Sequence, residues 1–376
     1  MKINVLDFGA KGQNRLLDTW GIQRALNQAQ KGPITVYIPS GTYHIAKALK
    51  IYEGTTLILD PDAQMLRTGK DALLKNGTSL KRYYGYNGNS HIKIQGGIWN
   101  MNGVHYPYNN TAMCLGHAQE IEVCHLTIKN VVGGHGIDAC GLDGLHVHHC
   151  NFVGFYDVTG ERWFSEAVQL DLFVEGAFPK FGVNDGTITK NAIIEHCYFG
   201  NSFEGDMQSW NRAIGSHATR FDRFYENIII QHNVFEDTQD YALTPLKSKN
   251  TFIQHNLFLN CTGGIRYLGV HQGKNAVTLE GNHEGKQGGD GLYVMHNDFV
   301  NNGAKDVLHI RSHHDAPHTD VNVIGNTFMG GHQVAQLTGV HDIAILNNEH
   351  SPQWNQKHVT AFITDKSEYL GRGMGH

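Results

Sequence analysis

The chain has 376 residues, of which 40% are hydrophobic, with 44 Gly and only 8 Pro, a composition typical of a folded protein with many turns. The formal net charge of −5 excludes the positive excess with which proteins bind nucleic acid or an anionic membrane surface. No apolar run approaches the roughly 18 residues of a membrane-spanning helix.

The first 50 residues predict a helix followed by two strands. The segment LLDTWGIQRALNQAQKG (16–32) has apolar or small residues at helical spacing and a Gly at its end, which predicts a short amphipathic helix. The segment ITVYIPSGTYHI (34–45) predicts a strand, a Pro-Ser-Gly turn and a second strand. We expect residues 1–50 to cap the open end of a repeat and to form its first coil.

One short unit recurs along most of the remaining chain: an alternating strand, a turn residue and an aromatic residue. The copies read GLHVHHCNF (144–152), NAIIEHCYF (191–199), NIIIQHNVF (227–235), NTFIQHNLF (250–258), GLYVMHNDF (291–299) and VNVIGNTF (321–328). Their shared columns hold Phe152, Phe199, Phe235, Phe258, Phe299 and Phe328, then Asn233, Asn256, Asn297 and Asn326 with Cys150 and Cys197, and then His149, His196, His232, His255 and His296. Such columns predict one all-β domain, a solenoid of parallel strands about 4.8 Å apart.

The His column has a structural explanation, because five histidines at one repeat position predict a ladder of stacked rings rather than metal ligands. The chain has no HExxH and no Cys/His metal pattern, so we expect no metal and no cofactor. Its six cysteines show no CxxC and no pairing pattern, which favours reduced, partly buried thiols.

A second strand precedes each repeat unit. These strands read AMCLG (112–116), GIDAC (136–140), AVQLD (167–171), AIGSH (213–217), ALTPL (242–246), GIRYL (264–268), VLHIR (307–311) and VAQLT (334–338). Positions two and four are mostly apolar and should face the interior, so positions three and five should face outward. The acids, His and Arg at these positions predict a functional site on one outward, concave strip, flanked by insertions near 155–190, 202–225 and 270–290.

The N-terminal motifs NVLDFGAKG, IQRAL and VYIPSGTYHI, together with the Asn and aromatic columns, resemble the pectate-lyase-type right-handed parallel β-helix superfamily over essentially the whole chain. The resemblance implies a single-stranded right-handed parallel β-helix with a short N-terminal capping helix. The superfamily includes polygalacturonase-like hydrolases, polysaccharide lyases, epimerases, sugar transferases and phage tailspike depolymerases. The order of acids, GSH (215–217) and a basic residue is similar to that of polygalacturonases, although GHG (134–136) lies in a different coil and QNRLLDTW follows GAKG.

The candidate catalytic residues are Asp138, Glu166, Asp171 and His217. The column positions predict Cα atoms about 5 Å apart for Asp171 and His217, and roughly 8 Å apart for Asp138 and Asp171. Carboxyl groups about 6.5–9.5 Å apart suit an inverting glycosidase, in which a water attacks the sugar. His217 is expected to orient a carboxylate or to bind a sugar hydroxyl. Glu166 should lie beside Arg212, either in a structural ion pair or as a proton donor whose pKa is raised by partial burial.

Further side chains are candidates for substrate binding: Gln169, Arg212, Arg266, His309, Arg311, Trp163 and Trp210. The basic residues could contact acidic or hydroxyl-rich sugars, or could be ordinary solvated charges. The two tryptophans lie in the insertions, where an exposed indole stacks on sugar rings and a buried one packs the loop against the core.

The leading hypothesis is a glycoside hydrolase that cleaves a polysaccharide or oligosaccharide with two carboxylates. A polysaccharide lyase or a sugar transferase on the same fold is an alternative, and so is a non-catalytic glycan-binding or receptor-binding module of the phage-tailspike type. We expect a glycan partner, no nucleic acid or membrane partner, and a monomer or a homo-oligomer such as a trimer. The segment MKINVLDFGAKG has no signal-peptide core, so we expect a cytoplasmic location, or an extracellular one by a route that the chain does not encode.

Overall fold

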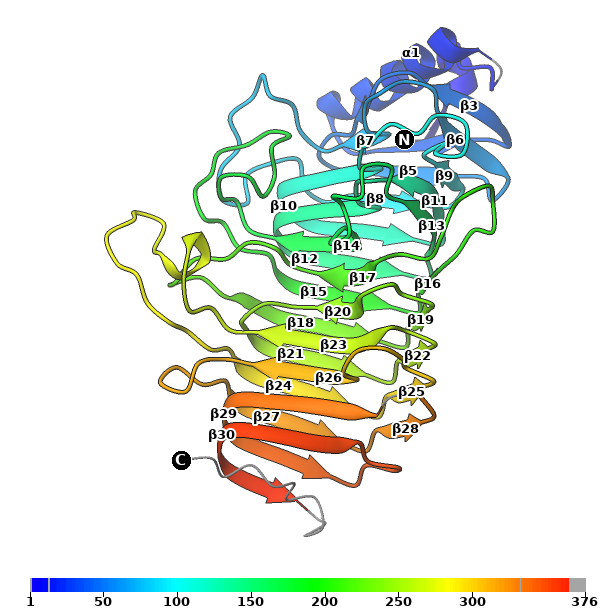
Figure 1. The fold of residues 1–376 in the computed structure, drawn as a ribbon. Coiled ribbons are helices and arrows are strands. Elements are labelled where there is room, and N and C mark those ends of the chain that lie inside the picture. The colour runs from blue at the N-terminus through cyan, green and yellow to red at the C-terminus, as the bar shows by residue number, and fades with distance from the viewer. Residues whose placement is uncertain (1, 13, 332, 365–376) are drawn as a thin grey trace. The chain divides into compact units, whose positions relative to one another are not determined.

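The chain winds as a right-handed parallel β-helix, as the sequence predicts, and successive coils stack their strands side by side (Figure 1). This computed structural model describes residues 2–12, 14–331 and 333–364. The chain divides into two compact units, Met1–Trp210 and Asn211–His376, and we describe each unit by itself.

Unit 1 builds its coils from two sheets, in which the strands of neighbouring coils pair in parallel. The strands of the first sheet are β1 (Lys2–Asn4), β2 (Ile34–Ile38), β4 (Leu49–Lys50), β5 (Thr55–Leu59), β7 (Leu74–Lys75), β8 (Ile92–Gln95), β10 (Met113–Cys124), β12 (Ile137–His148), β14 (Glu166–Asp171) and β15 (Lys190–Glu195). The strands of the second sheet are β3 (Gly41–Ile45), β6 (Ala63–Arg67), β9 (Ile98–Asn100), β11 (Thr127–Val132), β13 (Asn151–Tyr156) and β16 (Tyr198–Gly200).

Unit 2 repeats the same arrangement. Its first sheet holds β17 (Arg212–Gly215), β18 (Tyr225–Gln231), β20 (Tyr241–Thr244), β21 (Ser248–Gln254), β23 (Gly263–Leu268), β24 (Asp290–Met295), β26 (Leu308–Arg311), β27 (Thr319–Ile324), β29 (Val334–Leu346) and β30 (Gln353–Thr364). Its second sheet holds β19 (Val234–Glu236), β22 (Leu257–Leu259), β25 (Asp298–Val300) and β28 (Thr327–Met329). A short 3₁₀ turn, η3 (Lys274–Ala276), lies in the insertion predicted near 270–290.

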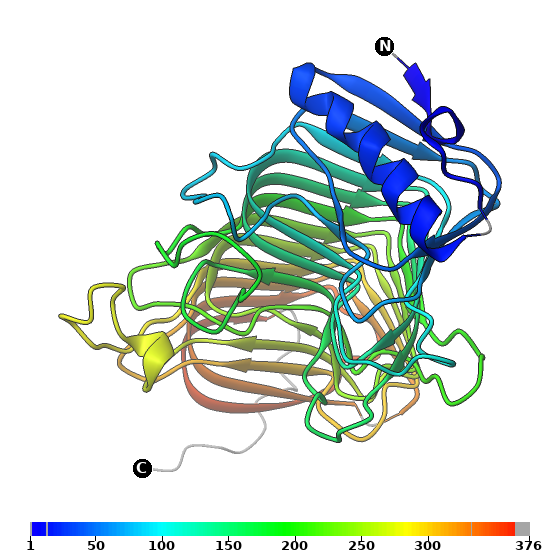
Figure 2. The same ribbon diagram turned by 90° about the horizontal axis from the view of Figure 1, so that it is seen from above.

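The predicted capping helix is α1 (Arg15–Leu26), which lies across the first coils of unit 1 (Figure 2). It is flanked by the 3₁₀ segments η1 (Val5–Phe8) and η2 (Asn27–Lys31). The Gln23 amide pairs with both backbone groups of Lys50, at 2.8 and 3.0 Å, and the Thr19 hydroxyl donates to His44 O and accepts from Ala46 N. The helix therefore supplies hydrogen-bond partners to strand-edge groups that would otherwise need water.

Stacked rings fill the interior at the predicted Phe column. The rings of Phe152 and Phe199 in unit 1 lie 4.9 Å apart with an interplanar angle of 5°. In unit 2 the rings of Phe258 and Phe299 lie 4.5 Å apart, and those of Phe299 and Phe328 lie 5.0 Å apart. The predicted register is confirmed for Phe152 with Phe199 in unit 1, and along Phe235, Phe258, Phe299 and Phe328 in unit 2.

The Asn column of unit 2 is a continuous hydrogen-bonded ladder. Each Asn Oδ1 accepts from the backbone N–H of the preceding member, at 3.0 Å between Asn233 and Asn256 and at 2.9 Å between Asn326 and Asn348. The sequence prediction missed Asn348, which extends the ladder by one coil. All of these side chains are buried, so the ladder satisfies polar groups that the interior would otherwise leave unpaired.

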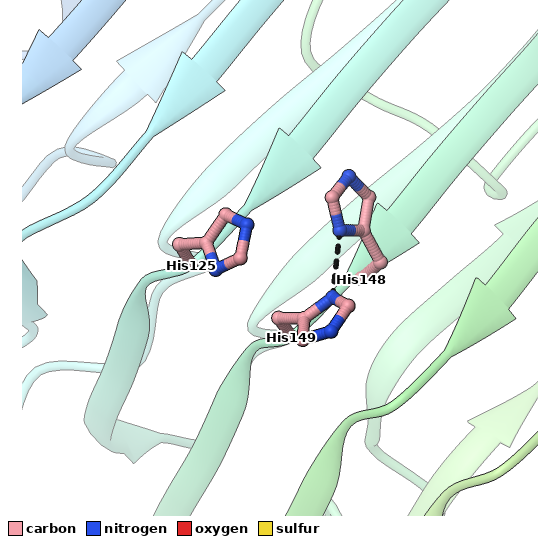
Figure 3. A group of neighbouring side chains, drawn as sticks. All are labelled: His125, His148 and His149. Carbon is pink, nitrogen blue, oxygen red and sulfur yellow. Dashed lines mark hydrogen bonds between the residues drawn. The ribbon is translucent and has the colours of Figure 1, made fainter.

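The His column lies where the chain turns between the two sheets. His149 has φ = 53° and its ring lies 4.8 Å from the ring of His125, which occupies the same turn one coil earlier (Figure 3). In unit 2 the rings of His232, His255 and His296 stack at 5.1 and 5.2 Å. The predicted structural ladder is therefore confirmed for these residues.

The cysteines agree with the prediction of reduced thiols, because all six are buried and none of them is in a disulfide. Among the described residues, no helix is long and apolar enough to cross a membrane.

Candidate functional site

The predicted alignment of the site strands in unit 1 is confirmed by their pairing. Asp138 on β12 pairs with Gln169 on β14, and Cys140 pairs with Asp171. Asp138 and Asp171 therefore lie on adjacent coils, two residues apart along the strand direction. Their side chains point to the same face, because residues two apart in a strand share a face.

The prediction that these side chains lie on an open strip is wrong in unit 1. Asp138 is 2% exposed, Gln169 is 1% exposed, and Glu166 and Asp171 are fully buried. All six residues of β14 are buried. Alternation along a strand predicts which face a side chain points to, but it does not predict what covers that face.

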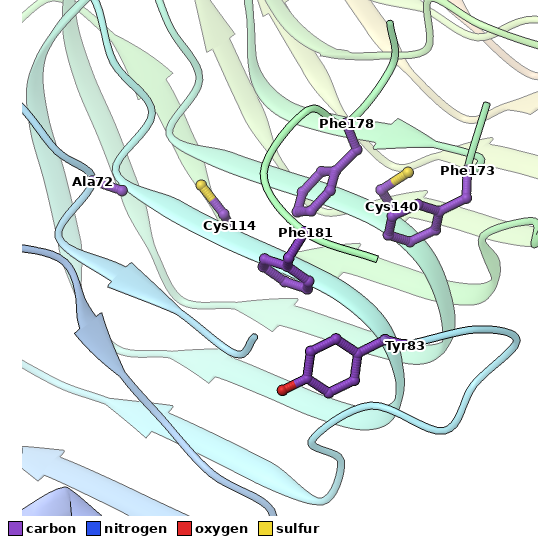
Figure 4. Packing of buried hydrophobic residues seen from close by; sticks show 7 residues of the cluster. All are labelled: Ala72, Tyr83, Cys114, Cys140, Phe173, Phe178 and Phe181. Carbon is purple, nitrogen blue, oxygen red and sulfur yellow. The ribbon is translucent and has the colours of Figure 1, made fainter. Parts of the chain in front are cut away.

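Aromatic side chains from two loops cover the outer face of β10 and β12 (Figure 4). Phe173, Phe178 and Phe181 come from the insertion at 172–189, and Tyr83 comes from the loop at 76–91. They pack with Cys114 and Cys140, which occupy positions three and five of their strands. We call this set, with Ala72, the aromatic cover.

The aromatic cover packs closely on the strands. Phe178 lies 5.2 Å from Phe173 and 5.0 Å from Phe181, ring centroid to ring centroid, and the Phe173 ring stacks on His117. A Cβ atom added to Gly116 would lie 2.8 Å from the Phe173 ring, so a larger residue at this position of β10 would displace the ring. The insertion predicted to flank the site is instead packed onto it.

Polar contacts hold the carboxylates under this cover. The Gln169 Nε2 donates to Asp171 Oδ2 at 2.6 Å, and Lys180 Nζ lies 3.8 Å from Asp138 Oδ2. Burial, and then the carboxylates of Asp171 and Asp138, raise the pKa of the Cys140 thiol well above its usual value. Cys140 therefore remains a neutral thiol beside the acids.

Glu166 contacts a histidine that the sequence prediction did not include. His135 Nδ1 lies 3.0 Å from the backbone oxygen of Glu166 and 3.7 Å from its carboxylate, and both side chains are buried. Arg162 Nη2 lies 3.5 Å from His135 Nε2. These contacts fit a tautomer in which Nδ1–H donates to the Glu166 carbonyl and Nε2 accepts from Arg162.

Arg212 belongs to unit 2, where it is buried and its Nε donates to Asp240 Oδ2 at 2.8 Å. Lys305 contacts the other oxygen of the same carboxylate. Burial would raise the pKa of Asp240, but the contacts with Lys305 and Arg212 outweigh it and lower that pKa. The predicted closeness of Arg212 to Glu166 and of His217 to Asp171 stays a prediction, because His217 also lies in unit 2.

Unit 2 carries basic side chains in the predicted outward columns. Arg266 pairs with His309 and Leu268 pairs with Arg311, as the alignment predicts. Unlike the acids of unit 1, Arg266 and His309 are partly exposed and Arg311 is exposed. The outward orientation predicted for these three residues is therefore confirmed.

The ring of Tyr241 lies beside two basic groups of unit 2. The guanidinium of Arg266 and the ammonium of Lys305 lie 5.5 and 5.4 Å from the centroid of the Tyr241 ring. Burial, and then the charge of Asp306, raises the pKa of the Tyr241 hydroxyl to about 12, so the hydroxyl stays protonated. We call Tyr241, Arg266, Lys305, His309 and Arg311 the basic patch.

The two tryptophans differ in exposure. Trp163 is 56% exposed and remains available for stacking on a sugar. Trp210 is fully buried, with its ring 5.1 Å from that of Phe155, so the prediction that it contacts substrate is wrong. The indole of Trp210 packs unit 1 instead.

Several contacting residues were missed because they stand just outside the aligned strands. His135 and Tyr241 each immediately precede a site strand, as Glu166 and Arg212 do. Extending the alignment by one column would have found His135 beside Glu166. Lys180 and Lys305 lie in loops, for which the repeat gives no register.

Residues 2–226 match the family described as rhamnogalacturonase A/epimerase, pectate lyase-like. The chain belongs to this family. The family resemblance inferred from the N-terminal motifs and ladders is thereby confirmed. The structural relatives of the chain include carbohydrate-active enzymes.

A curated relative is plasmin and fibronectin-binding protein A of Streptococcus pneumoniae (strain ATCC BAA-255 / R6), which is 26% identical over 264 residues. That match covers 62% of this chain and 36% of the relative, so the chain spans only about a third of that protein. Among solved structures, the Streptococcus pneumoniae surface protein and adhesin PfbA has a TM-score of 0.72 at 19% identity, covering 97% of this chain and 99% of that chain. The family 28 exopolygalacturonase of Yersinia enterocolitica has a TM-score of 0.65 at 15% identity, covering 96% of this chain and 78% of that chain.

Proposed function

We propose that the chain is a carbohydrate-active β-helix protein that binds an acidic polysaccharide, one with sugar carboxylates, through the basic patch of unit 2. The observation that carries this proposal is the exposure of Arg266, His309 and Arg311 in adjacent coils. Guanidinium groups bind carboxylates with paired hydrogen bonds, and Arg266 and Arg311 supply two such groups. The similarity to an exopolygalacturonase, whose name denotes a polymer of an acidic sugar, supports the same substrate class.

The charge balance of this region favours an anionic ligand. Four basic side chains surround the region: Arg212, Arg266, Lys305 and Arg311. Two carboxylates lie among these basic groups. Asp240 accepts from Arg212 and Lys305, and the Asp306 carboxylate lies 3.1 Å from the His309 ring nitrogen. Basic side chains therefore outnumber carboxylates in this region, which favours a polymer that carries carboxylates. Trp163 of unit 1 is a further candidate sugar contact, because its indole is exposed.

Hydrolysis of the glycosidic bond is the second candidate function. It is favoured by the placement of Asp138 and Asp171 on adjacent coils, two residues apart, which is the relationship from which an inverting pair was predicted. The aromatic cover opposes it. Each buried Phe contributes about 1.5–3 kcal/mol to stability, so exposing three of them costs about 5–9 kcal/mol, a large part of the stability of a typical domain. Binding therefore ranks above hydrolysis.

Isothermal titration with polygalacturonate, and with dextran as a neutral polymer, tests the binding proposal. We expect binding to polygalacturonate alone, weakened at least tenfold in Arg266→Gln/Arg311→Gln, since a hydrogen bond to a charged group contributes about 1.5–3 kcal/mol. Lys286→Gln is the matched control, because Lys286 is an exposed basic residue of unit 2 that pairs with Asp315. Equal affinity for dextran, or wild-type affinity in the double variant, would contradict the proposal.

A reducing-end assay on the same polymers separates binding from hydrolysis. The binding proposal expects no release of reducing ends. Release that disappears in Asp138→Asn and Asp171→Asn would establish the second candidate instead. Absorbance of an unsaturated product would indicate a lyase.

A further inference from the structure

Three imidazole rings lie together at one edge of unit 1, where β10 and β12 end (Figure 3). His125 follows β10, His148 is the last residue of β12, and His149 follows it. One ring nitrogen from each of the three lies within 4.8 Å of the others. His125 and His149 are exposed, so the group is open to ions in solution.

The ring nitrogens are arranged as ligands of one ion would be. His148 Nδ1 and His149 Nδ1 face each other at 2.9 Å. Zinc–nitrogen bonds of about 2.0–2.1 Å in tetrahedral geometry put two imidazole nitrogens on the same ion about 3.3 Å apart, so these two need to separate only slightly to bind one ion. The centroid of the His125 ring lies 4.8 Å from that of the His149 ring and 5.4 Å from that of the His148 ring.

A carboxylate orients the central ring. His148 Nε2 lies 3.1 Å from Glu122 Oε1, and Lys93 Nζ holds the same oxygen at 2.7 Å. With its Nε2–H donated to Glu122, His148 has a lone pair on Nδ1, the atom that faces His149. Metal-ligating histidines commonly donate their other N–H to a carboxylate in this way.

The stacked His ladder does not account for His148. In unit 2 the residues that precede ladder histidines are Gln231, Gln254 and Met295. The ladder rings there still stack, at 5.1 and 5.2 Å, against 4.8 and 4.9 Å in unit 1. A His at this position is therefore not needed for the fold. The neighbouring His146 already contacts a carboxylate, with its Nε2 2.9 Å from Glu195 Oε1. His148 is therefore the ring of the two whose Nδ1 can bind an ion.

We propose that His125, His148 and His149 form a binding site for a divalent transition-metal ion such as Zn²⁺ or Ni²⁺, with Glu122 as a positioning residue. Neutral imidazoles suit zinc, nickel and copper, whereas calcium and magnesium require oxygen ligands. Cys124 lies close to Glu122 and His148 and is a possible fourth side chain, since ligand atoms of these three also lie within 4.8 Å of one another. The site is independent of the basic patch, which belongs to unit 2.

The test is isothermal titration of the full chain with zinc chloride after removal of metal by a chelator. We expect saturable binding that weakens at least tenfold in His148→Gln and in His149→Asn. Both variants should fold, because two coils of unit 2 carry Gln at the position of His148 and because Asn tolerates the left-handed conformation of His149. Thermal unfolding without metal checks this. With zinc, the unfolding midpoint should rise in the wild type and rise by less in the variants, since an ion that binds only the folded state stabilises it in proportion to its affinity.

The matched control is His313→Gln/His314→Gln. These residues and Asp315 form another group of possible ligands, in unit 2. We expect this variant to keep wild-type zinc affinity, and Glu122→Gln to weaken binding while leaving the number of sites unchanged. Wild-type affinity in His148→Gln, or loss of binding only in the control variant, would overturn the proposal.

Discussion

Gln169 donates a hydrogen bond of 2.6 Å from its Nε2 to Asp171 Oδ2, and both side chains are buried. The two residues are neighbours on one face of β14, where the sequence predicted an outward carboxylate and a sugar-binding amide. A pair proposed to contact substrate is therefore a pair of buried side chains that bond to each other. The contribution of this hydrogen bond can be measured as a change in the free energy of unfolding.

Gln169→Leu should lower the free energy of unfolding by about 1–3 kcal/mol, because it removes the donor to a buried carboxylate and supplies none in its place. Denaturant unfolding measures this change. Gln336→Leu is the control, since Gln336 occupies the same column in unit 2, opposite His309, but is partly exposed. An equal loss in both variants would contradict a specific role of the buried bond.

Phe181→Ala should destabilise the protein by about 3–5 kcal/mol, the usual cost of truncating a buried Phe. Phe181 is 6% exposed and its ring lies 5.7 Å from that of Tyr83 across the aromatic cover. The variant should also make Cys114 and Cys140 accessible to a thiol reagent under native conditions, where the wild type should not react. Leu80→Ala, at a 91% exposed residue of the neighbouring loop, should change neither measurement. Fast labelling of the wild type would show that the cover opens readily.

The strand register could be read from the sequence, and the covering of the site could not. A column such as Asp138–Gln169 is fixed by side-chain alternation and by matching ladders, and the pairing confirms it. The loop that carries Tyr83 lies outside the repeat, so no periodicity indicates where its ring packs. The acids were therefore predicted on the right face with the wrong exposure.

The exposure of the basic residues was predicted better than that of the acids, because no described loop buries their strand positions. Arg266, His309 and Arg311 lie in coils where the described insertions leave the outer columns at least partly exposed. Alternation alone is then enough to predict that a side chain reaches solvent. Loop residues such as Lys305 could not be assigned, since they have no column.

Asn297→Ala should lower the free energy of unfolding by about 2–4 kcal/mol, because several buried groups lose their partners at once. The Asn297 Nδ2 donates to Ile253 O and to Asn326 Oδ1, at 2.8 and 2.9 Å, and its Oδ1 accepts from Asn256 at 3.0 Å. Denaturant unfolding of Asn297→Ala against Asn322→Ala measures the difference. Asn322 is a strand residue whose side chain bonds to Asp320 near the surface, so its loss should cost little.

Lys247 should make the stability of the protein depend on pH in the alkaline range. Burial lowers its pKa to about 7, and its ammonium lies 3.9 Å from the centroid of the Phe224 ring. An unfolded Lys has a pKa of about 10.4, so between about pH 7 and 10 the unfolded chain binds a proton that the folded chain has released. Stability should therefore rise with pH across this window, by an amount of order 2–4 kcal/mol.

Urea unfolding of the wild type, Lys247→Met and Lys249→Met at several values between pH 7 and 10 tests this dependence. Lys249→Met should keep the rise, because Lys249 is exposed although it lies over the same Phe224 ring, at 4.7 Å. Lys247→Met should flatten it, because the variant has no group at this position to lose a proton. An unchanged slope in Lys247→Met would mean that the buried ammonium keeps its proton throughout, held by the backbone oxygens of Phe221 and Arg223 that it contacts.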